Sequence, residues 1–180
     1  MWDGETLPVP VEEIVSSVYG LLVRDVDDMS AAPGAPPEAA GHLSGLLLTG
    51  PGEIWVDRAE GVKWPGRRRF TIGHELGHHV LHSTGGQPLF CRASVIDEAP
   101  ETETAPQPEL AAPRVPPIET EADIFAASIL MPTHLINAQY ERCDGEIDRL
   151  MKDFKCSQKA ITRRVLHVVP RGRRRPRRPT

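Results

Sequence analysis

The residues best suited to chemistry are two histidines and a glutamate within residues 70–82, FTIGHELGHHVLH. His74 and His78 stand four residues apart, so on an α-helix both imidazoles lie on one face and can reach the same metal ion. Glu75 lies one step round the helix, where it could take a proton from water during attack on a carbonyl. Neutral imidazole is a good zinc ligand, and zinc lowers the pKa of a coordinated water to about 7. The pattern therefore predicts a zinc hydrolase.

The helix that must carry these residues is expected over residues 70–82. At about 100° per residue, His74 and His78 border an apolar arc, whereas His79 and His82 fall on the polar side and are interpreted as bystanders. The apolar arc is made of Phe70, Gly73, Gly77, Val80 and Leu81. Two glycines inside a helix cost about 1 kcal/mol each, which favours close approach of another backbone over an exposed helix rich in His.

A catalytic zinc site needs a third protein ligand, and residues 118–132, IETEADIFAASILMP, offer three carboxylates. The spacing of their apolar residues predicts a helix. Glu119 lies about 50° from the centre of its apolar stripe, whereas Glu121 lies about 110° from it on the opposite side, towards solvent. Glu119 is therefore the favoured ligand, and Asp123, one turn along the same face, could accept the second ring N–H of a ligating histidine. The alternative is a helix start that carries acidic residues for its dipole.

Length and composition limit the class of protein. The chain has 180 residues, 39% of them hydrophobic, which is enough for one domain with a modest core. It has no run of about 18 apolar residues and its start lacks the regions of a signal peptide, so we expect a cytoplasmic protein with no membrane partner. Cys91, Cys143 and Cys156 have no CxxC spacing and are expected to be reduced thiols rather than a disulfide framework or a zinc site.

The net charge of −4 is unevenly distributed. Residues 171–180, RGRRRPRRPT, hold six Arg, and subtracting those six charges from −4 leaves −10 on residues 1–170. An acidic body argues against a broad nucleic-acid surface, whereas the tail is expected to be disordered and could bind a polyanion. Arg67–Arg69 would oppose the dipole of a helix that starts after them, so they either lie in the preceding turn or pair with carboxylates.

The remaining elements are short. Two apolar runs at residues 42–48 and 53–57 flank a Gly-rich turn and predict a β-hairpin. Residues 29–41 are expected to form a loose connection. Residues 96–117, rich in Pro, Glu and Thr, are expected to form a flexible insert. Helical spacing predicts further helices over residues 10–22, 132–143, 145–154 and 157–168.

Two segments taken together, RRRFTIGHELGHHVLH and IETEADIFAASILMP, resemble the ImmA/IrrE family of zinc metallopeptidases, in which RFTxAHELGHxxLH and ExEAxxFAAxLLMP recur. The hairpin and DRLMKDFKCSQKAITRRV extend the resemblance to about residues 8–170. The resemblance implies that His74 and His78 are zinc ligands, Glu75 the base and Glu119 the third ligand. Family members often have Asn where this chain has Asp123, and the insert is longer than the family leads us to expect.

The resemblance also implies the architecture. It predicts a compact α+β, zincin-like domain over residues 8–170, mostly helical with a small β-hairpin or sheet. The flexible insert at 96–117 would interrupt this domain, residues 144–168 would form its C-terminal helical segment, and a disordered Arg-rich tail would follow at 171–180.

The function implied is that of a bacterial or phage endopeptidase. Members of the family cleave or inactivate helix-turn-helix repressors of mobile elements or stress regulons, so the expected partner is such a repressor. A regulator that binds the repressor without cutting it is the alternative, although a purely structural metal site has no need of Glu75. Residues 145–168 could instead be a DNA-binding helix pair, with Lys159, Arg163 and Arg164 on its second helix, but a helical cap on the peptidase core is favoured.

Two features stay open at the level of sequence. The oligomeric state has no signal in the chain. The residue that would stabilise the oxyanion has several candidates, namely His134, Tyr140 and the Arg67–Arg69 cluster, and spacing does not choose among them.

Overall fold

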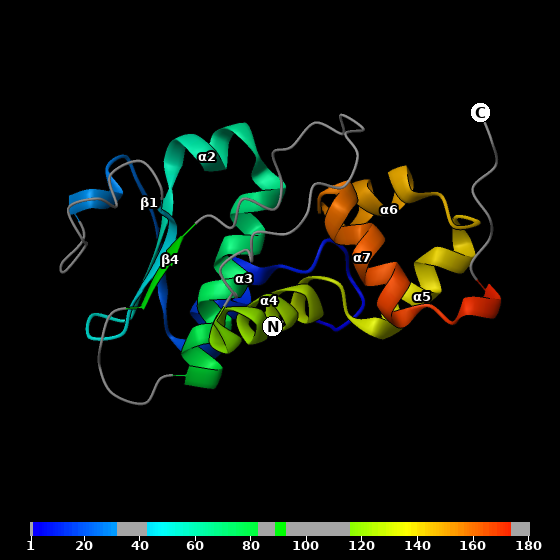
Figure 1. Cartoon of the computed structure of the whole chain (residues 1–180), viewed down its shortest axis with the longest axis horizontal. Coiled ribbons are helices and arrows are strands. Elements are labelled where there is room, and N and C mark those ends of the chain that lie inside the picture. Colours follow the sequence, from blue (N-terminus) through cyan, green and yellow to red (C-terminus); the bar gives the residue numbers. More distant parts are fainter. Residues whose placement is uncertain (1, 32–42, 83–88, 93–115, 174–180) are drawn as a thin grey trace, which may run out of the picture.

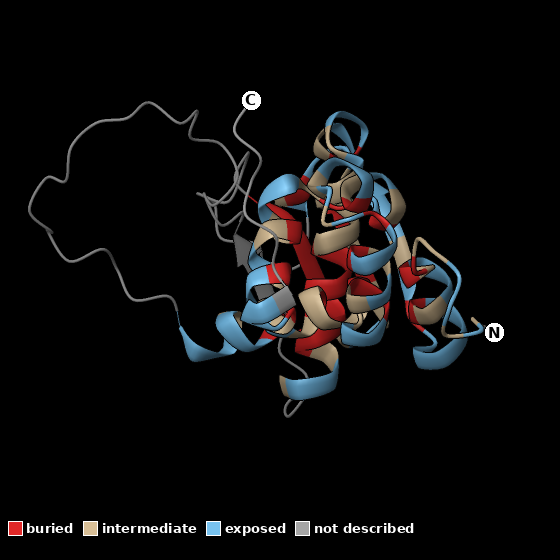
Figure 2. Ribbon diagram, turned by 90° about the vertical axis from the view of Figure 1, so that its right-hand side faces the viewer, coloured by how far each residue is buried: buried red, intermediate tan, exposed pale blue. Residues whose placement is uncertain are grey.

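The computed structural model describes residues 2–31, 43–82, 89–92 and 116–173. Figure 1 shows a sheet at one end of the molecule, the helices α3 (Pro65–His82) and α4 (Pro117–Leu130) beside it, and three shorter helices at the other end. Buried residues run through the centre of this arrangement (Figure 2). The expected α+β class, with helices predominating, is confirmed.

One mixed sheet has the strand order β1-β3-β2-β4. The hairpin predicted from the two apolar runs is confirmed, because β2 (Leu43–Leu48) pairs antiparallel with β3 (Glu53–Asp57). Two strands that we did not predict complete the sheet, since β1 (Leu22–Val26) pairs parallel with β3 and β4 (Leu89–Arg92) pairs antiparallel with β2. All six residues of β2 are buried, which is typical of a strand covered on both faces.

The first helix is shorter than expected. It was predicted over residues 10–22, but α1 (Val11–Tyr19) ends at Gly20, whose φ of 67° is left-handed and stops the helix. The chain then enters β1 at Leu22. A short helix that we did not predict, α2 (Arg58–Lys63), follows β3 and begins where the Asp57 side chain accepts a hydrogen bond from the Glu60 backbone N–H.

The three arginines lie inside α3, which begins at Pro65 and therefore earlier than the expected residue 70. Two of them pair with carboxylates, which was the alternative to a position in the turn before the helix. Arg67 Nε lies 2.8 Å from Glu60 Oε1, and Arg68 pairs with both Glu12 and Asp25. These ion pairs offset the unfavourable meeting of three cations with the helix N-terminus.

The expectation that glycines allow close backbone approach is confirmed between α3 and α4, which run antiparallel. A Cβ added to Gly77 would lie only 3.1 Å from the Ala122 Cα, and one added to Gly73 would lie 3.4 Å from the Ala126 Cα. At Gly77 the two helix backbones can approach this closely only because no side chain separates them, whereas at Gly73 a methyl group would make an ordinary contact.

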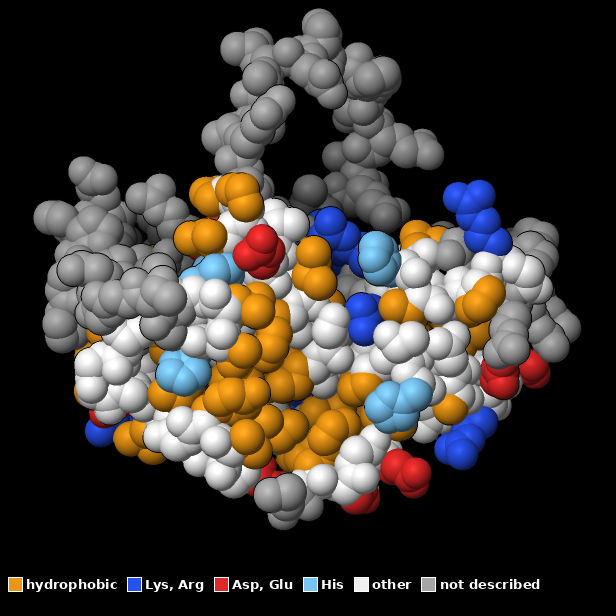
Figure 3. All heavy atoms as spheres, turned by 90° about the horizontal axis from the view of Figure 1, so that it is seen from below, with side chains coloured by type: hydrophobic (Ala, Val, Ile, Leu, Met, Phe, Trp, Pro, Cys, Tyr) orange, Lys and Arg blue, Asp and Glu red, His pale blue; other side chains and the backbone are white. Residues whose placement is uncertain are grey.

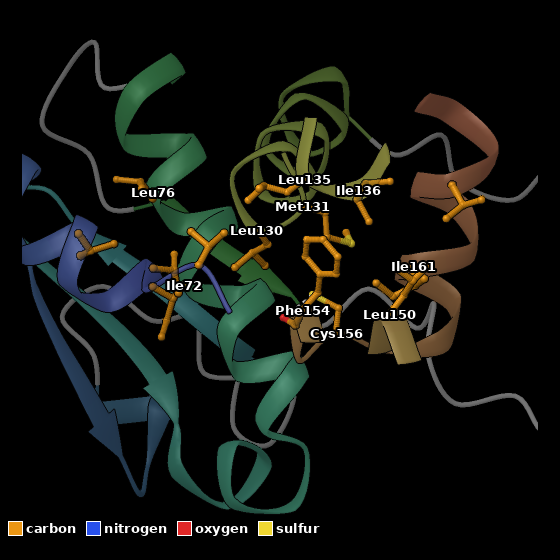
Figure 4. Close-up of a cluster of buried hydrophobic side chains, with 14 of the residues drawn as sticks. Ile72, Leu76, Leu130, Met131, Leu135, Ile136, Leu150, Phe154, Cys156 and Ile161 are labelled. Carbon is orange, nitrogen blue, oxygen red and sulfur yellow. Dashed lines mark hydrogen bonds between the residues drawn. The ribbon is translucent and has the colours of Figure 1, made fainter. Parts of the chain in front are cut away.

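The C-terminal helices share one hydrophobic core with α3 and α4. They are α5 (Thr133–Arg142), α6 (Ile147–Phe154) and α7 (Gln158–Val168), each within a few residues of its predicted bounds. The cluster includes Ile72, Leu130, Phe154 and Ile161, all without solvent exposure. Figure 4 shows the ring of Phe154 between Leu130 and Ile161. The basic residue Arg164 of α7 also donates to the Met131 carbonyl at the end of α4, which is typical of a packed cap.

Several predictions concern parts of the chain outside the described residues. Most of the insert predicted at 96–117 falls there, as do residues 32–41 of the predicted connection and 174–180 of the predicted tail; Arg171–Arg173 form a short 3₁₀ helix. Cys143 and Cys156 are buried free thiols. Within the described ranges, no helix is both long and apolar enough to cross a membrane.

Candidate metal centre

The two histidines of the motif face each other on one side of α3. Their Nε2 atoms lie 2.9 Å apart, and their rings meet at 72° with centroids 4.7 Å apart. Both residues are buried, with 4% of His74 and 1% of His78 exposed. The spacing of four residues therefore brings two imidazole nitrogens to one point, as expected for a helix.

Glu119 of α4 reaches the same point. Its Oε2 lies 3.2 Å from His74 Nε2 and its Oε1 lies 3.4 Å from His78 Nε2. One candidate ligand atom from each of the three residues lies within 4.8 Å of the other two. Two imidazoles and one carboxylate are a donor set that suits a catalytic zinc ion, so the residues present fit the metal that the motif implies. Their role as ligands remains a prediction.

Asp123 lies behind His74. Its Oδ1 is 2.8 Å from His74 Nδ1, the ring nitrogen that faces away from Glu119. A carboxylate there would accept the Nδ1–H and leave Nε2 with its lone pair directed at the centre. The structure thus places Asp123 where the helical wheel puts it, one turn along α4 from Glu119.

The electrostatics of the cluster favour positive charge. Burial alone would lower the pKa of His74, but hydrogen bonds to Asp123 and Glu119 outweigh it and raise that pKa to about 9. Burial alone would raise the pKa of Glu119, but hydrogen bonds from the two rings hold it far below its ordinary value. A proton on His74 therefore occupies an environment that a metal cation would also prefer.

Glu75 points from α3 towards β2 and is fully buried. Gly45 of β2 provides the room for it, because a Cβ at that position would lie 2.8 Å from Glu75 Oε1 and would also collide with the Thr71 methyl group. The negative charge of Glu75 contributes to the raised pKa of His74. The predicted base is therefore close enough to His74 to affect its pKa, and its side chain is held between α3 and the sheet.

Sequence reasoning missed two residues of this site. Gly45 could have been found, because an isolated glycine in an apolar strand indicates close approach of another group. His82, interpreted as a bystander, is not among the residues that could share a metal, but its ring contacts that of His78. The signal was the spacing of four that carries on from His74 through His78 to His82. His79, by contrast, packs edge-on against Tyr19.

The candidates for oxyanion stabilisation make other contacts. His134 Nε2 lies 3.1 Å from the Gly4 carbonyl, and Tyr140 is buried beside Gly145. Arg69 donates to the Val9 carbonyl, while Arg67 and Arg68 form the ion pairs described above. None of these contacts links a candidate to the histidine pair.

Comparison with models of known protein families gives a match. The model of the IrrE N-terminal-like domain, a peptidase family, matches residues 62–166, which is more than half of the chain. The matched region runs from the end of α2 to α7 and contains His74, Glu75, His78 and Glu119. No curated protein matches the sequence.

Proposed function

The chain belongs to the ImmA/IrrE family of metallopeptidases, and from that premise we propose that it is a zinc-dependent endopeptidase that cuts a protein regulator. The observation that carries this proposal is the meeting of His74, His78 and Glu119 beside the buried Glu75. Two imidazoles and a carboxylate leave room for a fourth ligand, as catalytic zinc sites require, and a structural site would need no adjacent base.

Each residue has a distinct task in peptide hydrolysis. A zinc ion bound here would polarise the scissile carbonyl and make water more acidic. Glu75 would accept a proton from the attacking water at a carboxylate oxygen and deliver it to the leaving amide nitrogen. Asp123 would hold the ring of His74 in one orientation through Nδ1. Burial of Glu75 excludes bulk water and strengthens these charge interactions.

The proposed substrate is a helix-turn-helix repressor of a mobile element or stress regulon. The family resemblance supports this choice, because its members act on such repressors. A surface feature agrees with a protein partner: Figure 3 shows hydrophobic side chains gathered in a continuous band on one face of the molecule. Large apolar patches of this kind mark sites of protein interaction.

Co-expression with helix-turn-helix repressors from the same genome tests the proposal. The wild-type chain should convert one repressor into discrete fragments. Glu75→Gln should bind about one zinc ion per chain and produce no fragments, because an amide keeps the shape of the carboxylate but cannot take the proton.

Glu119→Ala is the complementary variant. It should lose zinc as well as cleavage, which separates loss of the base from loss of the metal. Cleavage by Glu75→Gln at the wild-type rate would exclude the proposed mechanism. If Glu75→Gln still relieved repression in cells without any fragment, the protein would act by binding alone.

A further inference from the structure

We propose that His82 and Glu121 form a relay that positions the ring of His78 for metal binding. The inference rests on the metal site of the proposed function and assigns roles to two residues outside its predicted ligand set. His82 comes from the last turn of α3, and Glu121 comes from α4.

The contacts run in a line away from the centre. His78 Nε2 faces His74 and Glu119, and its other ring nitrogen, Nδ1, lies 3.2 Å from Nδ1 of His82. On its far side, His82 presents Nε2 to Glu121 Oε2 at 2.8 Å. The His82 side chain is only 13% exposed, whereas that of Glu121 is 58% exposed. The line therefore leads from a buried ligand candidate to a carboxylate at the surface.

Only one arrangement of protons satisfies all of these contacts when His78 binds a metal through Nε2. That nitrogen must then be unprotonated, so His78 carries its proton on Nδ1 and donates it. The partner atom, His82 Nδ1, must accept, which places the proton of His82 on Nε2. That N–H in turn points at the Glu121 carboxylate.

The relay completes a parallel between the two histidines of the motif. His74 has a carboxylate, Asp123, directly on its Nδ1. The Nδ1 of His78 reaches a carboxylate through one intervening imidazole. Neighbours of this kind fix the tautomer and orientation of a ligating ring and raise its basicity. Little more than one turn of α4 thus supplies Glu119 to the centre and a carboxylate to each ring.

His82 is not itself a candidate ligand. Within the described chain, the groups that could hold a metal together are His74, His78 and Glu119. The two ring nitrogens of His82 are directed at His78 and Glu121 instead. Its role is therefore that of a positioning residue, which acts on the metal through His78.

The test measures zinc affinity by competition with a chelator in purified full-length variants. His82→Leu removes the acceptor and should weaken zinc binding by about 10- to 100-fold. His82→Gln keeps an oxygen that can accept from His78 and should recover part of that loss. His79→Leu is the matched control, because it removes the neighbouring imidazole, which packs on Tyr19 away from the site, and should leave affinity unchanged.

A second measurement reads the relay directly. In the zinc-loaded wild-type protein, ¹⁵N NMR of the histidine rings should show His82 protonated on Nε2 and not on Nδ1. Glu121→Gln, a change at an exposed position that should not disturb folding, should weaken zinc binding less than His82→Leu does.

The outcomes separate this inference from the proposed function. A wild-type chain that binds no zinc would overturn both. Tight zinc binding by the wild type together with unchanged affinity in a folded His82→Leu, or a proton found on His82 Nδ1, would overturn the relay alone. If His82→Leu fails to fold, the ring tautomer in the zinc-loaded wild type still decides.

Discussion

The imidazole of His74 lies between two carboxylates, with Asp123 at Nδ1 and Glu119 at Nε2. These partners raise its pKa from 6.5 to about 9 in the metal-free protein, despite the opposing effect of burial. The protonated ring therefore stabilises the metal-free fold fully below about pH 6.5, and this contribution is lost as the pH rises through about 9. At pH 7 the ring holds a proton that a metal ion must displace.

Zinc binding at pH 7 should consequently release a proton from His74, and zinc affinity should rise with pH until about pH 9. Titration calorimetry in two buffers of different ionisation enthalpy measures the number of protons released. Asp123→Asn should reduce this number, because the hydrogen bond that His74 Nδ1–H donates to the carboxylate is a main cause of the raised pKa. A heat of binding that does not depend on the buffer would contradict the assignment.

Sequence reasoning succeeded at this scale where helical geometry alone decides. A spacing of four placed His74 and His78 together, and the wheel of the second segment placed Glu119 inward and Glu121 outward, where the structure has them. It did not predict the second contact of the His82 ring, because that contact depends on a partner from another helix. Glu121 of α4 supplies that partner, and no pattern within the sequence of α3 predicts it.

Among the elements, α3 is buried more completely than its hydrophobic pattern indicates. Periodicity predicted one apolar arc, but all eight residues from Thr71 to His78 are buried, while Val80 and Leu81 of the predicted arc are exposed. The reason is that α3 is covered twice. Its glycine face meets α4, and its Thr71 and Glu75 face meets β2. An apolar stripe marks only one buried face, so periodicity does not predict the burial of a helix that lies between two layers.

Substitution of the two glycines on α3 tests this packing. Gly77→Ala would bring a methyl group to 3.1 Å from the α4 backbone at Ala122, so the helices must separate, which should cost about 1–3 kcal/mol of unfolding free energy. Glu119 lies on α4 one turn before Ala122, so zinc affinity should fall as well. Denaturant unfolding of the metal-free protein and chelator competition give the two quantities.

Gly73→Ala is the matched control for that variant. Its added methyl group would meet Ala126 at 3.4 Å, an ordinary van der Waals distance. Alanine also has the higher helix propensity, by up to about 1 kcal/mol, so stability should hold or rise slightly. Equal destabilisation by both variants would contradict the assignment of the closest backbone approach to Gly77, since the two positions differ in their distance from α4.

The two unpredicted outer strands show a different limit of sequence reasoning. Arg24 and Asp25 break the apolar pattern of β1, which owes its place to parallel pairing with β3. The last strand, β4, has only four residues and pairs with β2, more than forty positions earlier in the chain. Short strands of this kind are specified by long-range partners rather than by their own composition.

For the molecule as a whole, the question is whether the C-terminal helices are an appendage or a part of the metal-binding domain. Phe154 of α6 is fully buried in the same cluster as Ile72 of α3 and Leu130 of α4 (Figure 4). The backbone agrees, since a Cβ at Gly66 of α3 would lie 3.1 Å from the carbonyl of Lys155. One core therefore spans α3 and the C-terminal helices, which the sequence could suggest only through the family resemblance.

This continuity predicts that the chain unfolds in one step. Phe154→Ala should lower the unfolding free energy of the metal-free protein by about 3–5 kcal/mol, because it removes a ring from a closed core. Far-UV circular dichroism and a zinc-affinity assay across a urea series should report the same midpoint, shifted together in the variant. Leu166→Ala on α7 is the control, since that side chain is 56% exposed and its loss should change stability by no more than about 0.5 kcal/mol. Loss of helical signal from Phe154→Ala at a urea concentration where zinc still binds with wild-type affinity would instead make residues 144–168 a separate unit, and would reopen their reading as a DNA-binding helix pair.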